Sequence, residues 1–327
     1  MAVDLNQHTS QQTPNLAAPL ASELLCPLFV VPGSNVTRPI ASLPGHQHLS
    51  LDTVVSKAAA LADLGIGGVL LFGLPEERTN EASSAFGKTA LVQSALRRIK
   101  ETVPSLRLIA DLCLCQYNNH GHCGVFRNGI LDNDQTLAHL ERLAVELAES
   151  GADVLMPSGM VDGAVGHIRQ ALNQSGFRHV KIMSQAVKYA SALYGPFREA
   201  AHISDALGKS SKEAYQIDPA NRAEALHEIA LDVAEGADMV MVKPAFSYGD
   251  VIRAVTKKFT VPVAAFSTSG EYGMIYALAA QSESRRLLLA QEMAASCKRA
   301  GATLLVTYFA EALARLPQSS QAAKIQG

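Results

Sequence analysis

The chain has 327 residues, of which 48% are hydrophobic and 18% are charged, so it can bury a large core and is not expected to be disordered. Its 28 basic and 30 acidic residues give a formal net charge of −2, and no block of lysine or arginine occurs, which argues against a nucleic-acid partner. No lysine or arginine precedes Arg38, no N-terminal run resembles a secretory signal, and none approaches the roughly 20 apolar residues that span a bilayer, so we expect a soluble cytoplasmic protein with no membrane partner.

Residues 1–24 are rich in Gln, Asn, Ser, Thr, Pro and Ala. Such a composition buries too little apolar surface to fold alone, so we expect a flexible N-terminal arm or one that embraces a partner. Residues 25–327 are predicted to form a single catalytic domain, with a frayed C-terminus.

One pattern recurs four times in chain order: a helical run, a glycine and then a short apolar segment. The glycines are Gly65, Gly151, Gly236 and Gly301. Glycine readily takes the left-handed conformation that ends a helix, and short apolar runs after such stops are typical of buried parallel strands. The pattern therefore predicts alternating helices and strands.

Further strands are expected at residues 25–31, 106–115, 179–184 and 261–267, with a weaker one at 214–216. About eight or nine strands separated by helices favour a (β/α)8 barrel, with a doubly wound open sheet as the alternative. No Gly-x-Gly-x-x-Gly turn or Walker loop follows any strand, which weakens the nucleotide-binding form of that alternative.

Polar residues that follow the predicted strands are the candidate site, because active sites of such barrels lie at the carboxyl ends of the strands. These residues are Asp111, Cys113, Ser158, Ser184, Lys188, Gln216, Lys243, Ser267, Ser269 and Tyr308.

Three of the five cysteines, Cys113, Cys115 and Cys123, crowd into residues 113–123. A clustered, odd set in a chain without a secretion signal favours a metal over disulfides, and soft thiolate ligands favour zinc. Three ligands leave a coordination position open, as in catalytic zinc sites. Cys26 and Cys297 are isolated in apolar segments and are expected to be buried fillers.

Cys113 and Cys115 would point to the same side of a strand and could share one ion. Two alternatives to an open metal site remain. His120 or His122 could complete the coordination and make the site purely structural, or the thiols could be free.

Two lysines are candidates for covalent chemistry. Lys243 follows a buried apolar run and precedes a proline, so it should project into the barrel mouth. A desolvated lysine loses its proton more easily and can form a Schiff base with a ketone, and a second cation such as Lys188 would lower its pKa further. The alternative is a rim lysine paired with a carboxylate.

The segment YGPFREA places Tyr194, Phe197 and Arg198 on an expected Gly-Pro turn. The arginine fork suits bidentate capture of a carboxylate, and an ordinary turn with a solvated arginine is the alternative.

Seven motifs occur in order along the chain: DLCLCQYNNHGHCG, PSGMVDGAVGHIR, YGPFREAA, YQIDPANR, EGADMVMVKP, SGEYGMI and RAGATLLVTYF. With these motifs, the chain from Leu25 to Leu313 resembles the δ-aminolevulinic acid dehydratase (porphobilinogen synthase) family. The resemblance implies a (β/α)8 barrel whose N-terminal arm wraps a neighbour, and a homo-oligomer, octamer or hexamer, built from dimers. It also implies a hydro-lyase that condenses two 5-aminolevulinate molecules to a pyrrole with loss of two waters, in tetrapyrrole (haem) biosynthesis.

The resemblance also implies roles for individual residues. Lys243 and Lys188 would hold the two substrates as Schiff bases, beside the catalytic carboxylate Asp111. The substrate-binding residues would be Ser158, Tyr194, Phe197, Arg198, Lys212, Gln216, Ser269 and Tyr308. Zinc would be bound by Cys113, Cys115 and Cys123, and Glu228 matches a glutamate that binds activating magnesium outside the active site.

The sequence departs from the family at several contact positions. Gly159 stands in place of an aspartate, Phe266 in place of a tyrosine, Ser267 in place of a histidine, Lys212 in place of a carboxylate-binding arginine and Gln116 in place of a proline. Two alternatives to the ordinary dehydratase follow: a paralogue that condenses a different aminoketone, and a non-catalytic zinc-binding relic of the fold.

Overall fold

The computed structural model describes residues 19–127, 130–208 and 211–317. Within these ranges, no helix is both long and apolar enough to cross a membrane. Most of the predicted N-terminal arm lies outside the described residues. Its last residues, Ala21–Glu23, form a 3₁₀ helix that is tied to the body of the protein, because Lys298 Nζ lies 2.6 Å from Glu23 Oε1.

Eight parallel strands form a closed barrel, since the last strand pairs with the first. In barrel order they are β1 (Leu24–Val30), β4 (Gly68–Gly73), β5 (Leu108–Leu112), β8 (Val154–Pro157), β9 (Lys181–Lys188), β10 (Met239–Lys243), β11 (Val263–Phe266) and β12 (Leu304–Val306). The predicted barrel is thus confirmed, and the open-sheet alternative is wrong.

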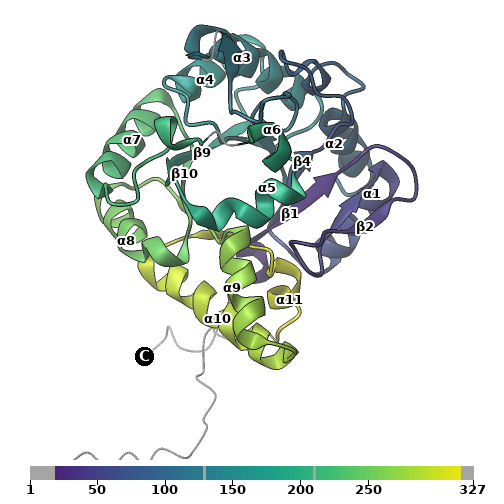
Figure 1. Ribbon diagram of the computed structural model, residues 1–327, viewed down its shortest axis with the longest axis vertical. Helices are drawn as coiled ribbons and strands as arrows, with labels where there is room; N and C mark the ends of the chain where they lie inside the picture. The colour runs from purple at the N-terminus through teal and green to yellow at the C-terminus, as the bar shows by residue number, and fades with distance from the viewer. Residues whose placement is uncertain (1–18, 128–129, 209–210, 318–327) are drawn as a thin grey trace, which may run out of the picture.

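Helices surround the barrel as an outer ring (Figure 1). They are α1 (Leu51–Asp63), α2 (Leu91–Thr102), α3 (Asn133–Glu149), α4 (Ala164–Gln174), α7 (Arg222–Glu235), α8 (Gly249–Lys258), α10 (Glu283–Ala300) and α11 (Ala310–Ala314). The ring looks open in the ribbon only because the ribbon leaves out the side chains. Large residues such as Phe29, Phe72 and Phe266 are fully buried there.

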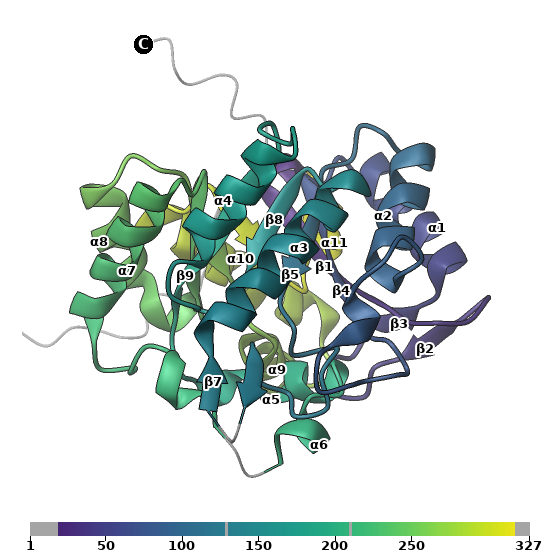
Figure 2. The ribbon, with the colours of Figure 1, turned by 90° about the horizontal axis from the view of Figure 1, so that it is seen from above.

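Extra elements gather at the carboxyl ends of the strands (Figure 2). They are α5 (Gly195–Ala200), α6 (Ser204–Leu207), α9 (Ser269–Ala279) and the hairpin of β6 (Val125–Arg127) and β7 (Ile130–Asp132). A second hairpin, β2 (Thr37–Pro39) and β3 (Gln47–Leu49), extends from β1. Short 3₁₀ helices span Ser83–Ala85, Ala192–Tyr194, Glu213–Tyr215 and Phe246–Tyr248.

The four glycines of the repeated pattern all adopt positive φ angles, as predicted: Gly65 at 74°, Gly151 at 98°, Gly236 at 104° and Gly301 at 114°. Gly301 is the most constrained of them. A Cβ atom there would lie 2.7 Å from the hydroxyl oxygen of Thr256, so a larger residue would meet both backbone strain and a steric clash.

Three local predictions are wrong. Residues 214–216 do not form a strand, because Glu213–Tyr215 is a 3₁₀ helix and only the neighbouring Ile217 makes an isolated bridge, to Tyr189. The strand expected to reach residue 115 stops at Leu112, so Cys113 and Cys115 lie in the following loop. The Gly-Pro segment begins helix α5 and is not a turn. Proline is compatible with the first turn of a helix, because the backbone N–H group that Pro196 lacks would have no partner within the helix there.

Candidate active site

Lys243 is the last residue of β10 and is only 6% exposed. Its Nζ lies 3.8 Å from the ring centroid of Phe266 and 5.4 Å from that of Phe197. Burial, together with the positive charge of Lys188, lowers the pKa of Lys243 to about 7. A large fraction of this amine is therefore unprotonated and nucleophilic at neutral pH.

Lys188 is the last residue of β9 and is the direct strand partner of Lys243. Its Nζ donates a hydrogen bond to the backbone carbonyl of Ser158, 2.5 Å away. Among the described residues, neither lysine forms a salt bridge. The alternative prediction, in which they are rim lysines paired with carboxylates, is therefore wrong.

Asp111 lies on β5 and is 5% exposed. Its Oδ2 accepts a hydrogen bond from Gln116 Nε2 at 2.9 Å, while its Oδ1 is buried without a hydrogen-bond partner in the described structure. Burial raises the pKa of this carboxyl group, and hydrogen bonds from Ser158 and Gln116, followed by the charges of the two lysines, oppose that rise. A buried oxygen atom that has no hydrogen-bond partner and lies in a pocket with two amines is typical of a site that binds a polar ligand.

The thiols of Cys113, Cys115 and Cys123 lie within 4.8 Å of one another and are all buried. Cys113 Sγ is 3.3 Å from Cys115 Sγ. The side chain of Lys212 is 6% exposed, and its Nζ donates to Cys123 Sγ at 3.3 Å. Hydrogen bonds from the other two thiols, with the charge of Lys212, hold the pKa of the Cys123 thiol well below its usual range.

This cluster fits a thiophilic metal, because three soft donors converge on one point in a dry environment. Among the described residues, neither His120 nor His122 joins the cluster as a ligand. The ring of His122 instead makes a 3.1 Å hydrogen bond to the hydroxyl of Tyr215. The chain thus supplies three ligands, as expected for an open site.

A pocket at the barrel mouth brings most of the predicted residues together. Predicted residues that line it are Asp111, Cys115, Ser158, Lys188, Tyr194, Phe197, Arg198, Lys212, Gln216 and Lys243. Phe72, Gln185 and Ile203 line it too, and the sequence patterns did not single them out. Their apolar or amide side chains carry no distinctive motif.

Ser269 and Tyr308 do not line this pocket, and Tyr308 lines a separate cavity with Tyr272 and Phe309. Ser269 Oγ accepts a hydrogen bond from Phe197 N at 2.9 Å, which links α9 to α5. This approach requires Gly270, because a Cβ atom there would lie 2.5 Å from the carbonyl oxygen of Leu193. The hydroxyl of Tyr308 is buried and has no hydrogen-bond partner in the described structure.

Other candidates lie elsewhere. Ser184 hydrogen-bonds Asp232 of α7, and Ser267 lies 3.2 Å from Met293 Sδ of α10. These two serines face the outer helices, so their expected place at the rim is wrong. Glu228 lies on α7, in a separate cavity outside the barrel. Cys26 and Cys297 are buried, as expected of fillers.

Glu271 is a residue that the sequence reading missed, although it stands in the SGEYGMI motif. It is fully buried, and its carboxylate accepts from the backbone N–H groups of Phe246, at 2.6 Å, and Ala245, at 3.5 Å. The same carboxylate caps α9 through Thr268. It therefore fastens the segment after Lys243 to the start of the helix that carries Ser269.

A buried lysine of lowered pKa, a second lysine at the paired position and a three-thiol cluster define a class of enzyme. It is a barrel enzyme whose buried lysines are suited to Schiff-base chemistry and whose thiols can hold a metal ion.

The comparisons with known proteins specify the family. Residues 6–316 match the sequence model of the Delta-aminolevulinic acid dehydratase family, so the chain belongs to this metal-dependent family of hydro-lyases. The chain is 46% identical over 298 residues to the Delta-aminolevulinic acid dehydratase of Synechocystis sp., with 90% of each protein covered. It is 47% identical over 293 residues to that of Halalkalibacterium halodurans, with 90% of this chain and 89% of the relative covered.

A solved structure agrees with the sequence relatives. The delta-aminolevulinic acid dehydratase (porphobilinogen synthase) of Toxoplasma gondii, in complex with the reaction product porphobilinogen, superposes with a TM-score of 0.87 at 36% identity. The match covers 93% of this chain and 87% of that one.

Proposed function

We propose that this protein is a porphobilinogen synthase, which condenses two molecules of 5-aminolevulinate to porphobilinogen with loss of two waters, in tetrapyrrole biosynthesis. The observation that carries the proposal is the pairing of Lys243 with Lys188 on adjacent strands, beside the three-thiol cluster.

Lys243 acts on the first substrate. Its amine attacks the ketone carbonyl, and loss of water gives an imine between Nζ and the substrate carbon. A pKa of about 7 keeps much of this amine unprotonated at neutral pH. The rings of Phe266 and Phe197 exclude water from Nζ, which slows hydrolysis of the imine.

Lys188 holds the second substrate in the same way, at a position fixed by the strand register. Asp111 lies in the same pocket with one unpaired oxygen, so it is placed to accept a proton from a substrate carbon. A carbon–carbon and a carbon–nitrogen bond then form between the molecules held side by side, and each substrate carbon releases its lysine amine. The two waters lost overall are those set free when the two imines form.

Cys113, Cys115 and Cys123 would hold the metal, for which zinc suits the three soft donors. When bound, zinc supplies a Lewis acid that polarises a carbonyl or promotes the loss of water. Lys212 offsets part of the negative charge of the thiolates through its contact with Cys123.

The substrate carboxylates need cationic and hydroxyl partners. Arg198, Gln216 and Ser158 line the pocket and are assigned to the second substrate. Ser269 and the unpaired hydroxyl of Tyr308 are assigned to the first, with Tyr194 and Phe197 packing against its carbons. The free space in the pocket is about 40 Å³, so lining side chains must shift when substrates enter.

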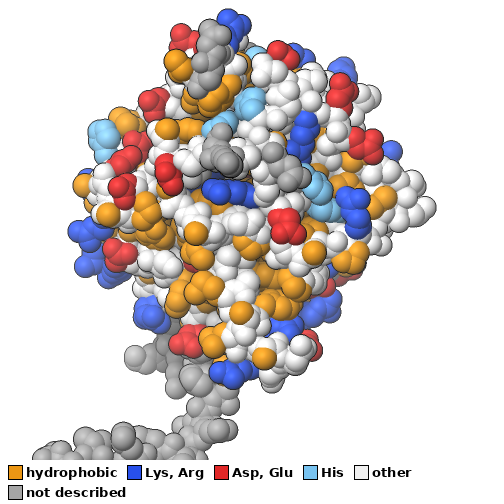
Figure 3. All heavy atoms as spheres, in the orientation of Figure 1, with side chains coloured by type: hydrophobic (Ala, Val, Ile, Leu, Met, Phe, Trp, Pro, Cys, Tyr) orange, Lys and Arg blue, Asp and Glu red, His pale blue; other side chains and the backbone are white. Residues whose placement is uncertain are grey.

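Two further features are proposed by analogy with the family. Glu228, half-buried on α7, would bind an activating magnesium ion. The chain would form a homo-oligomer, either an octamer or a hexamer that is built from dimers, through its N-terminal arm. Helix α9 suits such an interface, because Met274 and Leu278 are 52% and 58% exposed and hydrophobic side chains gather over this helix in Figure 3.

The proposal is tested with zinc-loaded, reduced protein and 5-aminolevulinate. A pyrrole that reacts with Ehrlich reagent is expected. Borohydride reduction followed by mass spectrometry is expected to locate adducts at Lys243 and Lys188. Absence of both pyrrole and adducts would refute the function.

A second candidate keeps the chemistry and changes the substrate. Lys212 contacts Cys123 rather than lying free for a substrate carboxylate, which favours this candidate. Gly159 does so too, because the family has an aspartate there. A Cβ atom at Gly159 would lie 3.2 Å from Val161 Cγ2 and 3.3 Å from the carbonyl oxygen of Cys123, so these atoms would have to shift to admit it. Borohydride trapping of another aminoketone at Lys243, with 5-aminolevulinate ignored, would select it. The third possibility, a non-catalytic relic, predicts zinc binding without any trappable imine.

A further inference from the structure

The lysine pocket holds one carboxylate among several cations. Asp111 is the only carboxylate among the described residues that line the pocket, and the basic residues that line it are Lys188, Arg198, Lys212 and Lys243. A buried carboxylate in such surroundings is expected to form an ion pair with the nearest amine. In the described part of the chain, Asp111 forms no salt bridge. Another contact must therefore hold its side chain in place.

Gln116 makes such a contact. Its Nε2 donates a hydrogen bond to Asp111 Oδ2 at 2.9 Å, and the two residues are 1% and 5% exposed. Because a carboxylate can only accept, the nitrogen of the amide and not its oxygen faces Asp111. A hydrogen bond to a charged group in a dry site is stronger than one between neutral groups.

The loop after β5 brings these two side chains together. The chain turns at Leu114, whose carbonyl oxygen accepts from the N–H groups of Tyr117 and Asn118, each at 3.0 Å. Gln116 lies within this turn and reaches back to the strand that carries Asp111. A proline, which the family has at this position, has no side-chain donor and could not make the bond.

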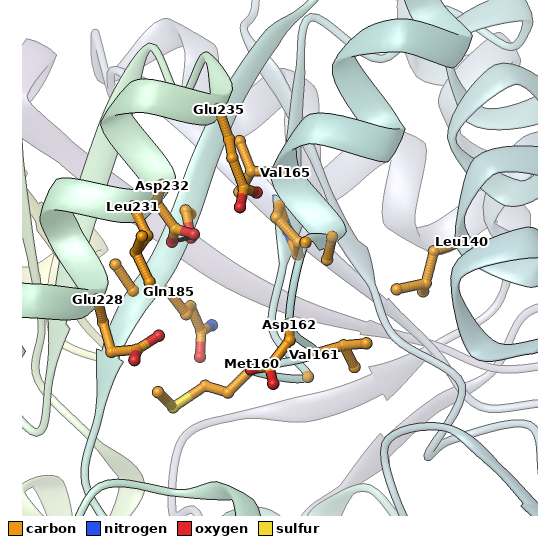
Figure 4. Close-up of a pocket in the computed structure, with 16 residues that line it drawn as sticks. Leu140, Met160, Val161, Asp162, Val165, Gln185, Glu228, Leu231, Asp232 and Glu235 are labelled. Atoms are coloured by element: carbon orange, nitrogen blue, oxygen red, sulfur yellow. Dashed lines mark hydrogen bonds between the residues drawn. The ribbon is translucent and has the colours of Figure 1, made fainter. Parts of the chain in front are cut away.

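Another amide that lines the pocket, that of Gln185, is engaged elsewhere. Its Nε2 lies 3.3 Å from Met156 Sδ. Figure 4 shows the amide of Gln185 directed into the cavity outside the barrel, between α7 and Asp162. It therefore does not duplicate the contact that Gln116 makes.

The position of the Asp111 carboxylate matters for the reactivity of Lys243. Burial and the charge of Lys188 lower the pKa of Lys243, and three acidic groups oppose this shift: Asp111, Cys115 and Glu271. An ion pair between Asp111 and either lysine would raise the pKa of Lys243, directly or by offsetting the charge of Lys188. The amine would then stay protonated and could not attack a carbonyl.

We propose that Gln116 is a positioning residue, whose amide holds the Asp111 carboxylate away from Lys188 and Lys243. Both amines then stay free to attack substrate carbonyls, and the unpaired Oδ1 of Asp111 stays free to accept a proton. Gln116 itself takes no part in bond making or breaking. This inference rests on the proposed imine chemistry at Lys243.

The test uses the full-length, zinc-loaded, reduced protein and 5-aminolevulinate. Borohydride trapping at Lys243 is followed against pH by mass spectrometry, and pyrrole formation is measured in parallel. Gln116→Met keeps the length of the side chain and removes its donor, so Asp111 is expected to pair with a lysine. The acidic limb of trapping should move up by about one pH unit. From a pKa of about 7, this shift lowers trapping at pH 7 about fivefold.

A double variant identifies the cause. Gln116→Met combined with Asp111→Asn removes the carboxylate, so the limb should return to that of wild type or lie below it. Pyrrole formation in this variant should stay about tenfold or more below that of wild type, because the base is absent. Trapping and pyrrole formation are thus separated, which a merely structural role of Gln116 would not produce.

Two further variants serve as checks. Gln93→Met is the matched control, because this buried amide on α2 donates to the carbonyl oxygen of Ala85 and its loss should leave the limb in place. Gln116→Asn keeps a polar amide but is too short to reach Asp111, so its limb should move like that of Gln116→Met. Circular dichroism and zinc content of each variant confirm that the fold and the metal are retained.

Two results would overturn the proposal. The first is a limb that coincides in wild type, Gln116→Met and Gln116→Asn, which would show that other contacts, such as that of Ser158, hold Asp111. The second is a limb that stays raised in the double variant, since the shift would then not come from Asp111. Absence of any adduct in wild type would instead refute the proposed function, and this inference with it.

Discussion

Lys188 and Lys243 are paired residues on the neighbouring strands β9 and β10, so two amines stand side by side at the mouth of the barrel. Each is the last residue of its strand. The pairing has a chemical consequence, because the positive charge of Lys188 contributes to the low pKa of Lys243. Two carbonyl substrates attached at these positions would be held next to each other.

Replacing Lys188 with methionine should raise the pKa of Lys243. Deprotonation of Lys243 near pH 7 is expected to set the acidic limb of imine formation, and loss of the neighbouring cation moves this limb to higher pH. The measurement is the pH dependence of borohydride trapping at Lys243, followed by mass spectrometry. An unchanged limb would show that burial alone sets the pKa.

Lys243 should also make stability depend on pH. Its pKa is about 7 in the folded protein and 10.5 for an unperturbed lysine, so the unfolded chain binds more protons between these values. Stability therefore rises with pH through this window by on the order of 4 kcal/mol, because one unit of pKa shift corresponds to about 1.4 kcal/mol. Urea unfolding of wild type and Lys243→Met at pH 7 and pH 10 checks this, since the variant should lack this contribution to the rise.

Lys212 should strengthen metal binding through its contact with Cys123. Lys212→Met leaves the charge of the thiolates less balanced and removes a buried donor, so zinc affinity is expected to fall about tenfold. Lys212→Arg keeps the charge and should retain most of the affinity. Competition with a chromogenic chelator measures this without reference to activity. Equal affinity in wild type and the methionine variant would contradict the role.

The barrel could be predicted from the sequence because its signals are local. Glycine stops such as Gly236 and Gly301 repeat, and short apolar runs follow them, so helix ends and strands could be placed without knowledge of distant contacts. Lys243 could also be placed from the sequence, since it ends a predicted strand. Lys188 was expected four residues beyond the end of its strand, whereas the strand in the structure runs to Lys188. The exact end of β5 could not be predicted from the sequence, because the apolar pattern continues through Leu114 although the pairing with β8 stops at Leu112.

Tertiary contacts explain the parts that the sequence could not predict. The side chain of Ser184 is directed toward α7 by its hydrogen bond to Asp232, which lies 48 residues away in the chain. The contact between Lys212 and Cys123 spans 89 residues, so a family-based reading as a carboxylate binder could not detect it. Glu271 was missed because a glutamate at the start of a helix is ordinarily a capping residue, and its bonds to Ala245 and Phe246 appear only in the fold.

Glu271 should position Lys243 through the backbone that follows it. Its carboxylate accepts from the N–H groups of Phe246 and Ala245 and from the hydroxyl of Thr268. The amide group of Glu271→Gln would place a donor against backbone N–H groups, which can only donate. The variant is expected to lose about 2 kcal/mol of stability and to trap substrate at Lys243 more slowly. The charge of Glu271 also raises the pKa of Lys243, so its loss should move the acidic limb of trapping to lower pH. That shift is opposite to the one expected for Lys188→Met, and a purely structural role would leave the limb in place.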